Sequence, residues 1–303
     1  MRPNPVLQKL GLADNDRVVI IHTDDIGMCQ ASLAAFADLV DFGLISSGAT
    51  MVPCPWFPQV AAYCRQHPSV DLGVHLTLTS EWDTYRWGPI STRDPASGMI
   101  DEEGYFYRQS EPVQEHGDPA AIQIELLAQV ERALKAGIDV THVDTHMGTV
   151  MHQKFTPVYL QVAAHYRLPP MLPRWDEAHL HEVGMDAETA AFAAPMLLEL
   201  EAQGVPMFDH IAMMPLDDPA HRVETAKRLF DALPPGLSYF ILHPAQDTPE
   251  LRAIAPDWPN RVADYEAFTS PELRDYVKGS GIHVIGYRVL RDLMRAAKIK
   301  DEE

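Results

Sequence analysis

The sequence predicts an α/β protein built as a TIM-like (β/α) barrel, irregular or seven-stranded. Two observations favour this class. Short apolar runs alternate with helical patterns about eight times along 303 residues, which is typical of a parallel sheet with helices outside. Several of these runs end in acids or histidines, as strands do at the catalytic face of a barrel. An open, doubly wound sheet is the structural alternative.

Apolar and β-branched runs predict strands at 17–22, 46–52, 71–78, 140–144, 170–173, 205–209, 237–242 and 282–286. Apolar residues at helical spacing predict helices at 29–42, 56–66, 119–136, 154–166, 186–203, 219–233, 261–278 and 287–298. We expect one catalytic domain over 1–303, because we find no repeat, low-complexity tract or interdomain linker.

Residues 80–118 interrupt the alternation of strands and helices. The segment is rich in glycine, proline, acids and aromatic residues, the last being Trp82, Tyr85, Trp87, Tyr105, Phe106 and Tyr107. A long irregular insertion after a barrel strand is often a lid or a binding loop. A surface hairpin that only covers the barrel is the alternative.

Composition limits the partners of the chain. The formal net charge of −19, from 43 acids against 24 bases, disfavours nucleic acid and anionic membranes as partners. No apolar run approaches the roughly 18 residues of a membrane span, and residues 1–16 lack the apolar core of a secretory signal. Cys29, Cys54 and Cys64 have no metal-type spacing, so we expect reduced thiols and a cytoplasmic location.

The first strand ends in two adjacent carboxylates. Four β-branched residues, Val18 to Ile21, precede Asp24 and Asp25, and Gly27 then allows a tight turn. Two acids at the end of a buried strand predict a metal ion or a proton transfer. The alternative is structural, because aspartate is a preferred N-cap and the 29–42 helix follows.

Three further strands end near histidines. In 71–78, alternation places His75 on the face that points into a barrel. In the fourth strand His142, Asp144 and His146 alternate onto one face, a pattern that suits a zinc-like ion. Asp144 there either binds the ion or orients an imidazole that does. The strand at 237–242 stops at His243. Because the carboxyl ends of parallel strands meet at one face, we expect these groups to converge.

Taken together, these motifs resemble the YdjC-like carbohydrate deacetylases, which are related to hopanoid-pathway deacetylases. The resemblance covers nearly the whole chain, and its matching elements are His22-Thr23-Asp24-Asp25-Ile26-Gly27, Gly73-Val74-His75-Leu76-Thr77-Leu78-Thr79, Thr141-His142-Val143-Asp144-Thr145-His146, His243-Pro244-Ala245, and Arg261, Asp264, Tyr265 and Phe268.

The resemblance implies a metal-dependent hydrolase that removes the N-acetyl group from a small saccharide. One divalent ion, zinc with magnesium or manganese as alternatives, would be held by Asp25, His75 and His146. Asp24 would be the general base and His243 the general acid. The resemblance also allows a homodimer. Residues expected near the substrate are Arg174, Trp82 and Asp144.

Two departures from the family pattern concern the sugar more than the chemistry. Met147-Gly148 stands where many relatives carry a later histidine, and Ala245 replaces the usual glycine. Two other classes stay open. A barrel amidohydrolase or phosphoesterase usually has an H-x-H near the first strand, and none is present. A non-catalytic sugar-binding protein would be expected to have lost a ligand or a base, and every mapped position is filled.

Overall fold

A parallel sheet forms the centre of the protein. The computed structural model describes residues 2–182 and 184–299, and within them the strands are β1 (Arg17–Ile26), β2 (Ser47–Thr50), β3 (Leu72–Leu76), β4 (Val140–Thr145), β5 (His210–Met213), β6 (Gly236–Leu242) and β7 (His283–Val284). The order across the sheet is β4-β3-β2-β1-β6-β5, and β7 pairs with β1. Every pairing is parallel. The predicted α/β class is therefore confirmed.

The sheet curls strongly toward a barrel without closing into one continuous ladder. His22 on β1 lies 3.0 Å from His142 on β4, although β2 and β3 separate these strands in the sheet. Between β4 and β5, residues 169–174 supply two isolated bridges, Val143 with Pro170 and Pro173 with Phe208. The curl explains how residues from distant strands meet inside.

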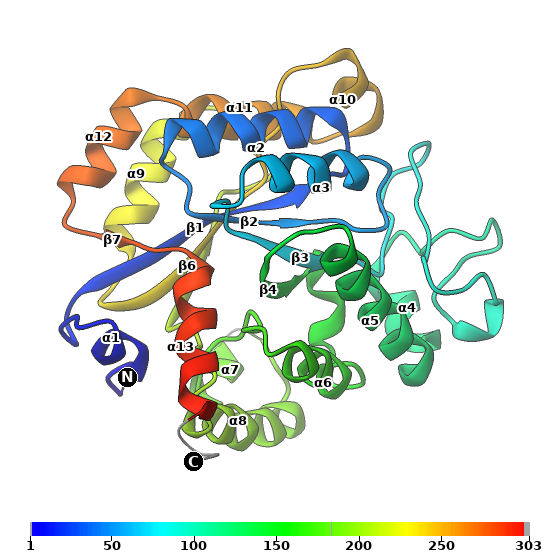
Figure 1. Ribbon diagram of the computed structural model, residues 1–303, viewed down its shortest axis with the longest axis horizontal. Helices are drawn as coiled ribbons and strands as arrows, with labels where there is room; N and C mark the ends of the chain where they lie inside the picture. Colours follow the sequence, from blue (N-terminus) through cyan, green and yellow to red (C-terminus); the bar gives the residue numbers. More distant parts are fainter. Residues whose placement is uncertain (1, 183, 300–303) are drawn as a thin grey trace.

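Helices surround the sheet (Figure 1). They are α1 (Pro5–Lys9), α2 (Gln30–Phe42), α3 (Phe57–Gln66), α4 (Ser110–His116), α5 (Pro119–Lys135), α6 (Thr156–Tyr166), α7 (Glu177–Glu182), α8 (Ala187–Ala202), α9 (Arg222–Ala232), α10 (Pro249–Ile254), α11 (Trp258–Phe268), α12 (Pro271–Gly279) and α13 (Tyr287–Ile299), with 3-10 turns η1 (Pro95–Ser97) and η2 (His146–Met151). Among the described residues, no helix has both the length and the apolar character needed to cross a bilayer.

Apolar side chains of the strands and helices fill the space between the sheet and the helices that surround it. On the α9 side, Val19 and Ile21 of β1 are buried together with Phe230 and Phe240, and these two rings stack with centroids 4.4 Å apart. Burial of this kind is the main source of stability for such a layered fold. It fixes β1 and β6 next to each other, and both strands end at the candidate site.

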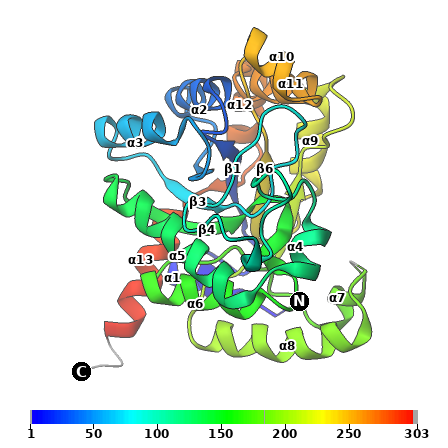
Figure 2. The same cartoon turned by 90° about the vertical axis from the view of Figure 1, so that its right-hand side faces the viewer.

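The irregular segment between β3 and α4 lies beside the ends of the strands. Residues 77–109 contain η1 and one antiparallel bridge between Ile100 and Phe106. Figure 2 shows this segment in front of the sheet, on the side where β1 ends. Its Tyr85 hydroxyl donates to the carbonyl of Met28, just beyond β1.

Two predicted strands differ from the structure because proline interrupts them. The run at 170–173 makes only the two bridges, since Pro170 and Pro173 have no N–H to donate. The strand predicted at 205–209 is wrong: Pro206 falls within it, and β5 begins at His210, which pairs with Ser238 of β6.

The helix predicted at 261–278 is two helices. Pro271 is the first residue of α12, with Ser270 as its N-cap, and a proline at that position cannot continue the hydrogen bonds of α11. The start of α11 also lies earlier than predicted, at Trp258, with Pro259 in its first turn. These prolines set the boundaries that apolar spacing alone did not predict.

Candidate metal centre and active site

The end of β1 turns both of its adjacent carboxylates toward the interior. Neighbouring residues of a regular strand point to opposite faces. Here the pairing of β1 with β2 shifts register between Thr23 and Ile26, and Asp25 has a left-handed φ of 61°. As a result, carboxylate oxygens of Asp24 and Asp25 lie 3.8 and 3.4 Å from the same atom, His75 Nε2.

The helix-cap alternative for these acids is wrong. The N-cap of α2 is Cys29. Asp24 instead accepts from His22 at 2.8 Å, and Asp25 accepts from Arg261 at 2.7 Å. Both carboxylates are therefore part of a polar cluster inside the sheet and do not cap the helix.

Asp25, His75 and His146 converge from β1, β3 and the residue after β4. Asp25 Oδ1 lies 3.4 Å from His75 Nε2 and 3.2 Å from His146 Nδ1, and all three ligand atoms lie within 4.8 Å of one another. Tetrahedral ligands placed about 2.0–2.1 Å from an ion are separated by roughly 3.3 Å. The spacing of this buried tripod fits a divalent cation.

The electrostatics of Asp25 also fit a cation ligand. Burial raises its pKa, but Arg261 and His146 outweigh burial and hold the pKa of Asp25 well below its usual range. The carboxylate is therefore ionised. Among the described residues, Asp25 Oδ1 has no hydrogen-bond partner although it is buried, so one lone pair is directed into the tripod and remains available to an ion.

Each histidine of the tripod is oriented by a further carboxylate. Asp144 Oδ1 accepts from His75 Nδ1 at 2.8 Å, which leaves His75 Nε2 facing Asp25. Glu81 Oε2 lies 3.0 Å from His146 Nε2, which leaves His146 Nδ1 facing Asp25. Burial lowers the pKa of His146, but Glu81 and Asp25 outweigh it and raise that pKa to about 9. Carboxylates that orient ligating imidazoles in this way are usual around protein metal sites.

Asp24 and His243 face each other next to the tripod. Asp24 Oδ2 lies 3.6 Å from His243 Nε2, while its Oδ1 accepts from His22 Nδ1. Burial lowers the pKa of His243, although Asp24 and Asp25 oppose the shift. The backbone N–H of His243 donates to Asp264 at 3.1 Å, which fixes the start of the segment after β6.

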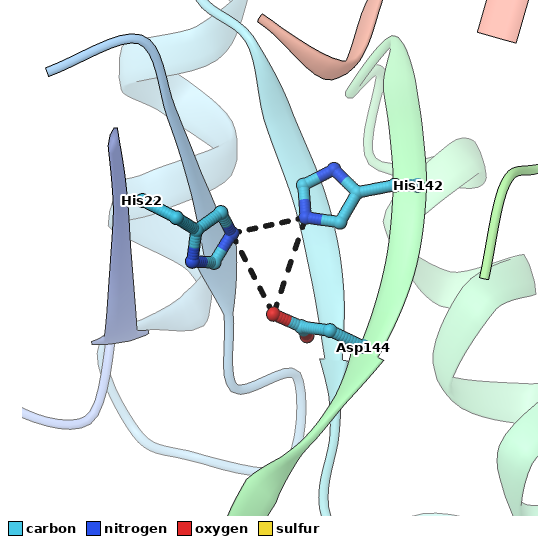
Figure 3. A group of neighbouring side chains, drawn as sticks. All are labelled: His22, His142 and Asp144. Carbon is cyan, nitrogen blue, oxygen red and sulfur yellow. Dashed lines mark hydrogen bonds and ion pairs between the residues drawn. The ribbon is translucent and has the colours of Figure 1, made fainter. Parts of the chain in front are cut away.

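Two other groups of described residues have metal-like spacing, namely His22, His142 and Asp144, and Asp24, His75 and Asp144. Their atoms are already used in hydrogen bonds. The two imidazoles of the first group bond to each other at 3.0 Å (Figure 3). Asp144 accepts from both His75 and the hydroxyl of Tyr239. The Asp25 tripod is therefore the better candidate.

Three residues were predicted near the substrate, and the structure places them at different distances from the tripod. Asp144 lies beneath the tripod and contacts His75. Trp82 is buried and packs against Arg261, whose guanidinium carbon lies 5.6 Å from the indole centroid. Arg174 is not at the site: it is buried, and it donates to Asp209 and to the carbonyls of residues 2 and 3.

The position of Arg174 corrects the prediction of a substrate role for it. Its partner Asp209 also accepts from the N–H of Leu237, which lies at the start of β6, whereas His243 follows the end of that strand. Arg174 therefore stabilises the opposite end of the sheet.

Three residues of the site were not predicted. Glu81 comes from the irregular segment, and no local pattern connects it to His146. Arg261 belongs to a recognised motif, but its pairing with Asp25 joins residues 236 positions apart. His22 alternates with Asp24 along β1, so strand periodicity could have indicated that the two side chains share a face.

The fold and the site together define a candidate hydrolase: a buried cation tripod beside an acid–base pair at the end of a parallel sheet. The model of the YdjC-like protein family matches residues 18–279, and the chain therefore belongs to the YdjC-like family.

Individual relatives agree with this assignment. A carbohydrate deacetylase of Thermus thermophilus is 34% identical over 289 residues, covering 95% of this chain and 99% of the relative. A carbohydrate deacetylase of Thermoanaerobacter pseudethanolicus is 22% identical over 275 residues, covering 91% of this chain and 100% of the relative. A crystal structure from Enterococcus faecalis V583, whose name refers to cellobiose-phosphate cleavage, superposes with a TM-score of 0.74 at 26% identity, covering 91% of this chain and 99% of that one.

Proposed function

We propose that this protein is a metal-dependent carbohydrate deacetylase that hydrolyses the N-acetyl group of a small amino sugar or short oligosaccharide. The observation that carries the proposal is the joint geometry of the Asp25–His75–His146 tripod and the Asp24–His243 pair. The names of the Thermus and Thermoanaerobacter relatives support the same reaction.

The tripod suits one divalent ion. Two imidazole nitrogens and one carboxylate oxygen favour zinc, with manganese or magnesium as alternatives. When bound, such an ion polarises the acetyl carbonyl and makes a water molecule more acidic. A single carboxylate in a fixed orientation beside it is then enough to act as the base.

Asp24 is placed to be that base. Its Oδ1 accepts from His22 at 2.8 Å, and its Oδ2 faces both His75 and His243. The Oδ2 atom would take a proton from the attacking water, whose oxygen forms the new bond to the acetyl carbon. A positioned base of this kind contributes about 10²- to 10⁴-fold to a rate.

His243 is placed to protonate the leaving amine. Because burial lowers the pKa of its imidazole, we propose that the side chain is neutral before reaction and receives the water proton from Asp24 across the 3.6 Å gap. His243 then donates that proton to the amide nitrogen as the carbon–nitrogen bond breaks. The products are acetic acid, which releases the second proton of the water to solvent and leaves as acetate, and the free amino sugar. Both side chains return to their starting states.

A residue at the edge of the site, Met147, concerns the choice of sugar. Met147, which stands where many relatives carry a histidine, is 44% exposed and has a left-handed φ of 51°. We propose that it contacts the substrate. Trp82 is 6% exposed, so its contribution is to hold Arg261 against Asp25, in place of the sugar contact predicted for it.

Acetate release tests the proposed function. We would assay the purified protein on N-acetylglucosamine, its β-1,4-linked oligomers and their phosphates, with added zinc, manganese or magnesium. Metal-dependent release of acetate and amine in equal amounts is the expected result. Release of phosphate without acetate would favour the phosphoesterase alternative, and saturable sugar binding without any product would favour a binding protein.

The cellular location and the oligomeric state of the enzyme stay predictions. Cys29, Cys54 and Cys64 are free thiols, in keeping with the predicted cytoplasmic location. The predicted homodimer is a matter for a measurement of mass in solution.

A further inference from the structure

A line of hydrogen bonds runs from Asp24 through the inside of the sheet to its other end. Asp24 Oδ1 lies 2.8 Å from His22 Nδ1, and His22 Nε2 lies 3.0 Å from His142 Nε2. His142 Nδ1 lies 2.9 Å from the hydroxyl oxygen of Thr141, which lies 2.6 Å from Asp71 Oδ1. Asp71 precedes the first residue of β3, so the line spans the length of the strands.

The two imidazoles meet edge to edge between β1 and β4. Figure 3 shows His22 and His142 pointing at each other, with the carboxylate of Asp144 beside them. Both rings are fully buried. Tyr287 stacks on His142 at 3.7 Å with the planes 7° apart. A Cβ at Gly73 would lie 2.5 Å from the His142 ring, so the absence of a side chain there makes room for the pair.

Counting protons sets the direction of these hydrogen bonds. Four contacts need four protons. With one N–H on each ring, His22, His142 and Thr141 supply three of them. An ionised carboxylate only accepts, so the fourth proton lies either on the carboxyl of Asp71 or as a second proton on one of the two rings, since a contact without a proton inside a buried line is costly.

Asp71 is the group best placed to carry the fourth proton. Its carboxyl is deeply buried, and burial raises the pKa of that carboxyl although Ser47 and the N–H of Arg288 donate to it. If Asp71 carries this proton, Asp71 donates to Thr141, Thr141 to His142, His142 to His22, and His22 to Asp24. Every contact is then satisfied, and the four donors point the same way.

We propose that His22 and His142 are positioning residues, held with Thr141 and Asp71 in a one-way hydrogen-bond line that fixes Asp24 by its Oδ1 atom. The catalytic part of this inference rests on the proposed function, in which Asp24 is the base. The line keeps the Nδ1–H tautomer of His22, so Oδ1 is occupied and Oδ2 stays directed at the water and at His243. If the ring proton of His22 were on Nε2 instead, the lone pair of Nδ1 would face the carboxylate of Asp24, and this hydrogen bond would be lost.

The tautomers can be observed without any assay of activity. Long-range ¹H–¹⁵N spectra of ¹⁵N-histidine-labelled protein, assigned with the His22→Asn and His142→Gln variants, report which ring nitrogen carries hydrogen. We expect the proton on Nδ1 of His22 and on Nε2 of His142. A proton on Nε2 of His22, or a doubly protonated ring at either position, would overturn the one-way line whether or not the protein is a deacetylase.

Two variants of His22 separate its two contacts. Asparagine places an amide donor near the position of Nδ1, whereas glutamine reaches only the position of Nε2. Once wild-type turnover on N-acetylglucosamine oligomers has been shown, we expect His22→Asn to keep kcat within about 5-fold and His22→Gln to lose about 10²-fold, the scale of a misplaced base. KM and metal content should stay near wild type in both.

Equal losses of kcat in the two His22 variants, with Tm and metal content retained, would contradict the positioning role. Asp71→Asn provides the matching test at the far end, because an amide can donate to Thr141 as a protonated acid does. We expect this variant to keep the His22 tautomer. The rival explanation is a second metal ion held by His22, His142 and Asp144. Two ions per wild-type chain that fall to one in His142→Gln would establish that explanation and overturn ours.

Discussion

Asp24 and His243 face each other because their strands are neighbours in register. Thr23 of β1 pairs with Leu242 of β6, so the next residue of each strand emerges at the same level. Asp24 Oδ2 thereby lies 3.6 Å from His243 Nε2. The base and the acid of the proposed reaction are thus held by the longest ladder of the sheet, and neither depends on a mobile loop for its position.

Substitution of the proposed acid should separate protonation from metal binding. His243→Gln removes the proton donor and none of the tripod. We expect turnover to fall about 10²-fold or more with the metal retained, and an N-acetyl substrate with a good leaving amine to be partly spared. Steady-state rates on good and poor leaving groups provide the measurement. An equal loss on both would instead indicate a positioning role.

The rate should depend on the neutral form of His243. Because burial lowers the pKa of this side chain from 6.5, it stays able to accept a proton at neutral pH and loses that ability as the pH falls through the lowered pKa. We expect wild-type kcat to fall on the acid side with a midpoint below pH 6.5, and this limb to disappear in His243→Gln. A midpoint well above 6.5 would contradict a neutral resting state.

Burial of Asp264 should make the folded protein less stable as the pH rises. Burial raises its pKa from 3.8 to about 6, although Arg222 opposes the shift. The folded state therefore holds the proton more tightly than the unfolded state. The resulting stability is complete below pH 3.8 and is lost as the pH rises to about 6, by roughly 3 kcal/mol.

Denaturant unfolding of the wild type and Asp264→Asn at pH 4, 5, 6 and 7 measures this effect. We expect the unfolding free energy of the wild type to fall relative to that of the variant across the series, because asparagine does not titrate. A difference that stays constant with pH would show that Asp264 has an ordinary pKa in the folded protein.

Glu81 should tune the affinity of the metal without being a ligand. Its carboxylate lies 3.0 Å from His146 Nε2, so Glu81→Gln weakens the orientation and basicity of that imidazole. We expect metal affinity to fall by about 10- to 100-fold, measured by competition with a chelator. Glu103→Gln is the matched control from the same segment, since Glu103 pairs with Arg86. Equal affinities in the two variants would exclude the role of Glu81.

Residues that end strands were predictable from the sequence, and residues that reach the site from elsewhere were not. An apolar run followed by a polar residue indicates a strand end, and on that basis Asp25, His75 and His146 were expected to converge, as the structure shows. Glu81 and Arg261 contact the tripod from a loop and a helix. Their contacts follow from tertiary packing, for which one sequence has no periodic signal.

Errors in the predicted fold have a similar origin. The apolar run at 205–209 resembles a strand, yet the ladder with β6 starts only at His210, after Pro206. The family resemblance placed Arg174 near the site, but its side chain pairs with Asp209, which accepts from the N–H of Leu237 at the start of β6. Sequence order indicates which residues end a segment, whereas the end of the sheet at which they lie depends on the three-dimensional register.

The metal content of two neighbouring variants tests the central claim most directly. Asp24→Asn and Asp25→Asn change adjacent residues by the same atoms, so each is the control for the other. Elemental analysis should find about one divalent ion per chain in the wild type and in Asp24→Asn, and little or no metal in Asp25→Asn. The turnover of Asp24→Asn should be reduced about 10²- to 10⁴-fold. Full metal occupancy in Asp25→Asn, or a fully active Asp24→Asn enzyme, would contradict the assignment of ligand and base.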